Sequence, residues 1–123
     1  MLLDTSAWID FFQGTEKGAK VKNVLKEDKC YTSIVSIAEI VNWCEKNNID
    51  KKYYLDVIEK SSFIINLKKD IVILAGIINY ENKIKIKNWG MLDSFIYATG
   101  RIYKLKILTL DHHFKDLEGV DLV

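Results

Sequence analysis

Residues 1–12, MLLDTSAWIDFF, decide the fold of this chain. Leu2-Leu3 has the apolar character of a short buried strand. Asp4-Thr5-Ser6 supplies side chains that cap the beginning of a helix, and the apolar run 7–12 continues that helix. A switch from strand to helix at this point is typical of an α/β protein.

The same switch recurs along the chain. Further strands are predicted at residues 30–34, 63–67, 107–110 and 120–123. Helices are predicted at 7–12, around 21–25, at 36–44, around 53–58, at 71–80 and at 91–103. Strands that alternate with helices predict an α/β fold: a three-layer sandwich whose central, mainly parallel sheet is covered by helices on both faces.

Composition sets the broad class of the protein. The 123 residues are 49% apolar and 28% charged, which excludes a disordered chain and a coiled coil. A chain of this size buries about two-thirds of its surface, so we expect one domain over residues 1–123. The net charge is only +1, so a nucleic-acid partner has to bind a local patch.

Other features bear on location. The spacing of Cys30 and Cys44 disfavours a zinc site and a disulfide scaffold, so we interpret them as buried thiols, with a disulfide between them as the weaker alternative. No apolar run approaches the roughly 18 residues of a membrane span, and Asp4 interrupts the N-terminus before a signal-peptide apolar region. We therefore expect a cytoplasmic protein without a membrane partner.

Four acidic residues are candidates for a common site. Asp4 follows the first predicted strand and Asp111 follows the strand 107–110. Sites in parallel sheets form at the carboxyl ends of the strands, which is where both residues lie. Glu39 and Asp93 stand near the starts of helices within apolar surroundings. The four carboxylates are predicted to converge.

Each acid also has a purely structural interpretation. Asp4 is a favoured helix-capping residue, and Asp111 suits a turn or a cap. Residues 36–39 have the spacing of a capping box, in which Glu39 would bind a backbone N–H. Asp93 would complement the helix dipole from a first turn. Taken together, these interpretations require four acids to meet at one sheet edge by coincidence.

Converging carboxylates need a cation or protons. Two charges 4 Å apart repel by about 4 kcal/mol at an effective dielectric constant near 20. Mg²⁺ or Mn²⁺ suits oxygen ligands and activates water for phosphodiester hydrolysis. Two other acidic magnesium sites fit less well. Ser6 stands where a haloacid-dehalogenase-like phosphatase needs its second Asp, and Lys68-Lys69 follows the strand where a receiver domain needs its phosphoacceptor.

Four motifs in this order resemble the PIN domain and, within it, the VapC-type toxin ribonucleases: 2–12 (LLDTSAWIDFF), 36–39 (SIAE), 92–99 (LDSFIYAT) and 109–114 (TLDHHF). The resemblance implies a parallel-sheet sandwich, a metal-dependent endonuclease acting on single-stranded RNA, and a homodimer held by a small antitoxin. It also implies that Asp4, Glu39, Asp93 and Asp111 are the catalytic and metal-binding acids, with Mg²⁺ or Mn²⁺ as the cofactor.

The chain departs from the family pattern at two positions. His113 stands where many members carry a further acid, which leaves the number of metal ions open. Ser94 stands where alanine is common, a difference expected to matter little. Thr5, Ser6 and Thr109 suit two roles equally, orienting the carboxylates or capping and strand packing.

Several other residues leave two interpretations open. His112 and His113 either contact RNA phosphates or are loop residues without a role. The segment 83–87 (KIKIK) is typical of a charged edge strand, with an RNA-tracking face as the alternative. Arg101, eight residues after Asp93, is either a substrate contact or a solvated charge. Six aromatic residues either pack in the core or line a dimer or antitoxin groove: Trp8, Phe11, Phe12, Trp43, Tyr53 and Tyr54.

The leading hypothesis is an endoribonuclease that acts as the toxin of a toxin–antitoxin pair. One alternative is a PIN-like RNA-processing nuclease outside such a pair. Another is a PIN-like domain that binds RNA or a partner without cleaving. The four intact acids favour an enzyme, because only metal chemistry offsets their mutual repulsion.

Overall fold

The computed structural model describes residues 1–123 and contains five short strands. They are β1 (Leu2–Leu3), β2 (Tyr31–Ser33), β3 (Phe63–Ile65), β4 (Ile107–Thr109) and β5 (Val120–Leu122). All pair in parallel, in the order β3-β2-β1-β4-β5. The first strand of the chain thus lies at the centre of the sheet, where Leu2 is in register with Tyr31 of β2 and Ile107 of β4.

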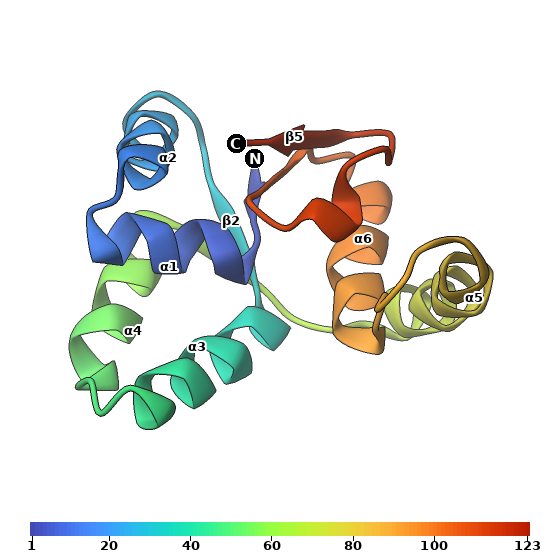
Figure 1. The fold of residues 1–123 in the computed structure, drawn as a ribbon, viewed down its shortest axis with the longest axis horizontal. Coiled ribbons are helices and arrows are strands. Elements are labelled where there is room, and N and C mark those ends of the chain that lie inside the picture. The colour runs from blue at the N-terminus through green and yellow to red at the C-terminus, as the bar shows by residue number, and fades with distance from the viewer.

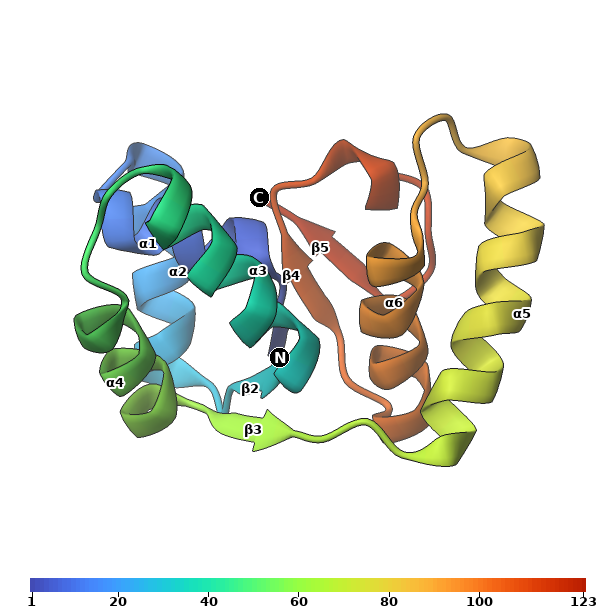
Figure 2. The same cartoon turned by 90° about the horizontal axis from the view of Figure 1, so that it is seen from below.

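Six α-helices cover the sheet: α1 (Thr5–Gln13), α2 (Glu16–Glu27), α3 (Ile34–Lys46), α4 (Lys51–Ser61), α5 (Lys69–Lys85) and α6 (Met91–Tyr103). The first four helices lie on one side of the strands and α5 and α6 on the other (Figures 1 and 2). No helix combines the length and the apolar character that crossing a bilayer requires.

Two hydrophobic cores explain the three layers. Successive strand side chains point to opposite faces of a sheet, so Leu2 and Leu3 of β1 enter different cores. Leu2 packs in the cluster that contains Ile71 of α5 and Ile96 of α6. Leu3 packs with a cluster that contains Trp8 of α1. The predicted α/β sandwich with a parallel sheet is confirmed.

The main error in the predicted elements concerns residues 83–87, which do not form an edge strand. Lys83 and Lys85 belong to the last turns of α5. The buried stripe of that helix keeps a helical spacing as far as Asn82, which carries the helix beyond the predicted end at residue 80. Lysines in the last turn also complement the helix dipole.

The strand order sets the location of a site. β1 pairs with β2 on one side and with β4 on the other, so the direction of winding changes between β1 and β4. Ligands of open parallel sheets bind outside the carboxyl ends of the strands at such a switch point. In this chain that point is where β1 runs into α1 and β4 runs into the short helix η1 (His112–Phe114).

Candidate functional site

All four predicted acids lie around the carboxyl ends of β1 and β4. Asp4 directly follows β1, and Asp111 stands two residues after β4. Glu39 comes from α3 and Asp93 from the first turn of α6. Their charges act on one another, because Glu39 and Asp111 both raise the pKa of Asp4, and Asp93 and Asp111 raise that of Glu39.

The carboxylate of Asp4 accepts hydrogen bonds from three groups of the protein. It is the N-cap of α1, and its Oδ1 accepts a hydrogen bond from the Thr5 N–H at 2.8 Å. Its Oδ2 accepts from the Thr109 hydroxyl at 2.8 Å and from the Ser6 hydroxyl at 3.2 Å. Burial raises the pKa of Asp4 to about 6 against the opposing effect of these hydrogen bonds. The capping interpretation is therefore correct, and it coexists with a place in the site.

The hydroxyls around Asp4 also bind the chain that leaves β4. Ser6 Oγ accepts from the Leu110 N–H at 3.0 Å, and Thr109 Oγ1 accepts from the Asp111 N–H at 3.0 Å. Of the two roles left open by the sequence, orienting the carboxylates is thus observed for Ser6 and Thr109. Together they tie the start of α1 to the segment that carries Asp111.

Glu39 has a different partner from the one its motif predicts. Helix α3 begins at Ile34 and is capped by Ser33, whose Oγ accepts from the Val35 N–H at 3.2 Å. Ser36 therefore lies inside the helix, and the capping-box interpretation is wrong. Glu39 Oε1 instead accepts from the Thr5 hydroxyl at 2.8 Å, and burial is the main cause that raises the pKa of Glu39.

Asp93 combines a capping role with a place in the site. It lies in the first turn of α6, as the structural interpretation expected, and its Oδ2 also accepts from the Gly90 N–H at 3.0 Å, a capping bond that this interpretation did not include. Burial, followed by the charge of Asp111, raises the pKa of Asp93, while the Gly90 N–H and His113 lower it. The carboxylate thus sits where its ionised form needs a positive neighbour.

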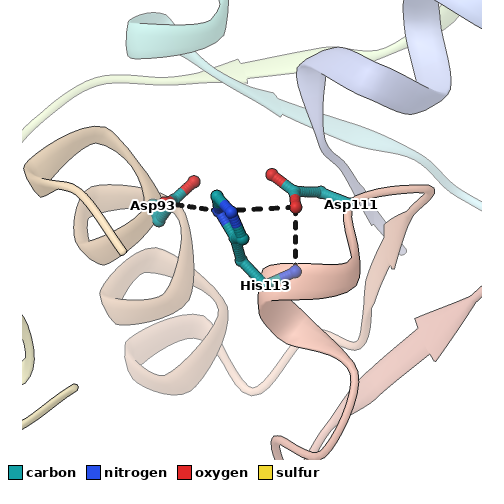
Figure 3. A group of neighbouring side chains, drawn as sticks. All are labelled: Asp93, Asp111 and His113. Carbon is teal, nitrogen blue, oxygen red and sulfur yellow. Dashed lines mark hydrogen bonds and ion pairs between the residues drawn. The ribbon is translucent and has the colours of Figure 1, made fainter. Parts of the chain in front are cut away.

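His113 also points into this group, although the sequence alone leaves its role open and does not include it among the site residues. Its imidazole Nδ1 lies 3.4 Å from Asp93 Oδ2 and 3.5 Å from Asp111 Oδ1, and the three side chains point toward one another (Figure 3). One ligand atom from each residue falls within 4.8 Å of the others. The buried Nδ1 atom has no hydrogen-bond partner. Two carboxylates and an imidazole nitrogen are a donor set that fits a divalent cation.

A groove adjoins the acids on the side of α1 and α3. It has a volume of about 420 Å³, and Thr5 and Glu39 form part of its wall. Asn42, Trp43 and Lys46, all from α3, line the same groove. An extended polar chain in this groove would pass the carboxylate of Glu39.

Two other residues singled out in the sequence are not among the side chains that meet at Asp93 and Asp111. His112 is exposed. Arg101 stands eight residues after Asp93, which places it about 12 Å farther along the axis of α6. It lines a cavity of about 410 Å³ with Lys106, which precedes β4, at the opposite end of the strands. Arg101 therefore lies at the other end of α6 from Asp93.

Ser94 matters more than its departure from the family pattern predicts. Its hydroxyl accepts from the indole N–H of Trp89 at 2.7 Å, and both side chains are buried. The same hydroxyl donates at 3.3 Å to Asn79 of α5. Alanine at this position would leave the Trp89 N–H without a partner inside the core.

The six aromatic residues also separate into different roles. Trp8 is fully buried, and Phe12 stacks on Tyr54 with ring centroids 3.9 Å apart. Trp43 stacks on Tyr54 in turn, while Tyr53 remains largely exposed. Most of this group therefore packs between α1, α3 and α4, although Trp43 also lines the groove beside Glu39.

Comparisons with known proteins agree with this fold. No curated protein sequence matches the chain. A toxin–antitoxin complex from Klebsiella pneumoniae is similar in structure, with a TM-score of 0.77 and 23% identity over 98% of this chain and 94% of that one. VapBC2 from Rickettsia felis, bound to a promoter DNA fragment, has a TM-score of 0.77 and 17% identity over 99% and 96%.

A third similar structure is VapC20 from Mycobacterium tuberculosis, described as a sarcin-ricin loop cleaving toxin. It has a TM-score of 0.74 and 14% identity over 98% of this chain and 97% of that one. At these sequence identities the similarity is one of fold. The model of the PIN domain family matches residues 1–120, so the chain belongs to the PIN domain family.

Proposed function

We propose that this chain is a metal-dependent endoribonuclease that cleaves single-stranded RNA and acts as the toxin of a toxin–antitoxin pair in the cytoplasm. The observation that carries the proposal is the set of four carboxylates at the β1/β4 switch point. Three of the four have raised pKa values, chiefly through burial. A protein gains nothing in stability from burying like charges together, so their common position indicates a ligand of positive charge.

Asp93, Asp111, Asp4 and Glu39 are the residues that would hold Mg²⁺ or Mn²⁺. When bound, such an ion lowers the pKa of a coordinated water and neutralises the charge that develops on a phosphodiester. The hydroxyls of Thr109, Ser6 and Thr5 fix the orientation of Asp4 and Glu39 before any ion binds. Support of this kind commonly accounts for 10–100-fold of metal affinity.

The groove beside Glu39 is the proposed path of the RNA. Trp43 offers an aromatic surface for a base, Asn42 an amide for hydrogen bonds, and Lys46 a charge for a phosphate. These groups suit a single strand, because a base has to leave its stack in a duplex before it can lie against a side chain.

A homodimer is part of the same proposal. Ile73, Ile77, Tyr80 and Ile84 lie at helical spacing on α5, and each is more than half exposed. An exposed apolar stripe of this kind marks a protein contact, and we assign it to a second copy of the chain. Light scattering should show a dimer that Ile77→Glu converts to a monomer. A monomeric wild type would contradict this assignment.

The nuclease is tested by incubating single-stranded RNA with the purified protein and Mg²⁺ or Mn²⁺. Cleavage should stop in EDTA and return when the ion is restored. For variants that remove one of the four acids, the matched control is Asp116→Asn, which removes an exposed acid close to Asp111 in the sequence. Cleavage that continues undiminished in chelator would contradict the proposal.

The toxin role is tested separately, by expressing the chain alone and together with a small protein encoded beside it. Expression alone should arrest growth, and the partner should co-purify and restore growth. An antitoxin cation that pairs with Asp4, Asp93 or Asp111 would compete with the metal, so inhibition should weaken as the metal concentration rises. Normal growth with no partner retained would leave a nuclease outside a toxin–antitoxin pair.

A further inference from the structure

The position of His113 follows from the turn that carries it. Residues 112–114 form the single turn η1, in which side chains one residue apart point in different directions. Phe114 is fully buried and packs against Trp89 with ring centroids 5.1 Å apart. With Phe114 anchored in the core, His112 faces solvent and His113 faces Asp93 and Asp111.

The contacts of His113 differ from those of an ordinary ion pair. Its Nδ1 is 3.4 Å and 3.5 Å from one oxygen of each carboxylate, whereas charge-assisted hydrogen bonds are roughly 2.7–2.9 Å long. Nδ1 is buried and has no hydrogen-bond partner, although it lies between two acceptors. Neighbouring ligand atoms around a divalent ion at about 2.1 Å are separated by roughly 3 Å, so the observed separations suit a shared cation.

We propose that His113 is a nitrogen ligand of the divalent ion and gives this site a preference for transition-metal ions, Mn²⁺ among them, over Mg²⁺. The inference rests on the proposed metal-dependent function. Mg²⁺ binds oxygen ligands almost exclusively, whereas first-row transition metals accept an imidazole ligand more readily, with Mn²⁺ the weakest binder of that series. An acid at this position would give an all-oxygen site, which suits Mg²⁺, so the histidine changes the choice of metal while keeping a ligand there.

The test measures ion binding directly, on the full-length protein without an affinity tag. Pulsed electron paramagnetic resonance of bound Mn²⁺ detects the ¹⁴N nucleus of a directly ligated imidazole. His112 and His113 are the two histidines of the chain, so the source of a nitrogen signal is unambiguous once each is replaced. The matched control is therefore His112→Ala, next to the ligand but exposed.

We expect ¹⁴N coupling in the wild type and in His112→Ala, and none in His113→Asp or His113→Gln. Calorimetric titrations should show the ratio of Mn²⁺ to Mg²⁺ affinity falling roughly tenfold or more in His113→Asp. His113→Gln, which adds no negative charge, guards against a failure of His113→Asp to fold. Loss of Mn²⁺ binding in folded His113 variants, with binding retained in His112→Ala, would also support the ligand role.

Two results would overturn the inference. One is Mn²⁺ bound to the wild type without ¹⁴N coupling, which would leave the proposed metal-dependent nuclease intact. The other is an unchanged ratio of affinities in folded His113 variants. Failure of the wild type to bind either ion would instead overturn the metal site itself, and the proposed function with it.

Discussion

The two halves of the acidic site are built differently. Asp4 is 7% exposed, and both of its oxygens accept hydrogen bonds from neighbouring residues of the chain. The side chains of Asp93 and Asp111 are 20% and 31% exposed, and each accepts one hydrogen bond from a backbone N–H. The fold therefore fixes the orientation of Asp4, which we call the buried half of the site. Asp93 and Asp111, the open half, keep lone pairs for an ion.

The largest effect is expected in the open half. Asp111→Asn keeps an oxygen that accepts from the His113 N–H but removes a ligand charge, so cleavage should fall on the order of 1,000-fold. The measurement is the initial rate of RNA cleavage together with Mn²⁺ binding by calorimetry. Asp116→Asn serves as the control. A rate within tenfold of the wild type would show that the ion is held elsewhere.

The buried half should control the pH dependence of stability. The pKa of Asp4 is about 6 in the folded chain against an ordinary value of 3.8, so the unfolded chain ionises first as pH rises. Without metal, the contribution of Asp4 to the free energy of unfolding should therefore decrease between about pH 4 and pH 6, by roughly 3 kcal/mol. Below this range Asp4 is protonated in both states, and above it the loss is complete.

Urea unfolding in EDTA over this range tests the pH effect. Saturating Mn²⁺ should remove the slope, because the ion compensates the charge. Asp4→Asn should reduce the slope, and the part that remains comes from Glu39 and Asp93, whose pKa values burial also raises. In this variant the amide oxygen can accept from the Thr5 N–H, and the NH₂ can donate to the Thr109 hydroxyl. Stability that rises with pH in EDTA would show that the hydrogen bonds of Asp4 outweigh its burial.

Thr109→Val tests whether the hydrogen bonds around Asp4 affect metal binding at Asp93 and Asp111. The substitution keeps the shape of the side chain but removes the donor to Asp4 and the acceptor of the Asp111 N–H. Mn²⁺ affinity should fall about 10–100-fold. Thr99→Val, in which a buried hydroxyl that binds Phe95 O within α6 is lost, should leave the affinity unchanged. Equal effects of the two variants would mean that general destabilisation, rather than orientation, is measured.

The smallest effect concerns the stability of the open half. Asp93→Asn removes one of several like charges and keeps an oxygen for the Gly90 N–H. In EDTA the free energy of unfolding should rise by about 1 kcal/mol or less, because partial exposure screens the repulsion. Thermal melts measure this. A variant that melts several degrees below the wild type would show that the Asp93 charge is structural.

Much of the fold could be predicted because hydrophobic periodicity reports local structure directly. Residues 1–12 placed a strand before a helix, and the alternation predicted the parallel sheet. The prediction for the segment 83–87 was wrong, because its Lys-Ile alternation has the period of a strand. The helix α5 continues into it, and the polar residue Asn82 extends the buried stripe of that helix. A buried polar side chain carries no signal in a hydrophobic pattern.

The site divides in a similar way. Asp4, Glu39, Asp93 and Asp111 could be singled out as candidates, because Asp4 and Asp111 follow strands, Asp93 lies in the first turn of a helix, and Glu39 lies within an apolar motif. The reason assigned to Glu39 was wrong, since the N-cap of α3 is Ser33 and the partner of Glu39 is Thr5, 34 residues earlier in the chain. Hydrogen bonds over such separations depend on how α1 and α3 pack, which neither segment encodes alone.

The sequence by itself determined the order of strands and helices, the acidic composition of the site and its position after β1 and β4. Those properties follow from local spacing and from the direction of parallel strands. Only the tertiary structure decided that Asp4 is enclosed by three hydrogen-bond donors and that His113 lies between Asp93 and Asp111. The physical reason is packing: burial of Phe114 orients the turn that carries His113, and the pairing of β1 with β4 brings Thr109 to Asp4.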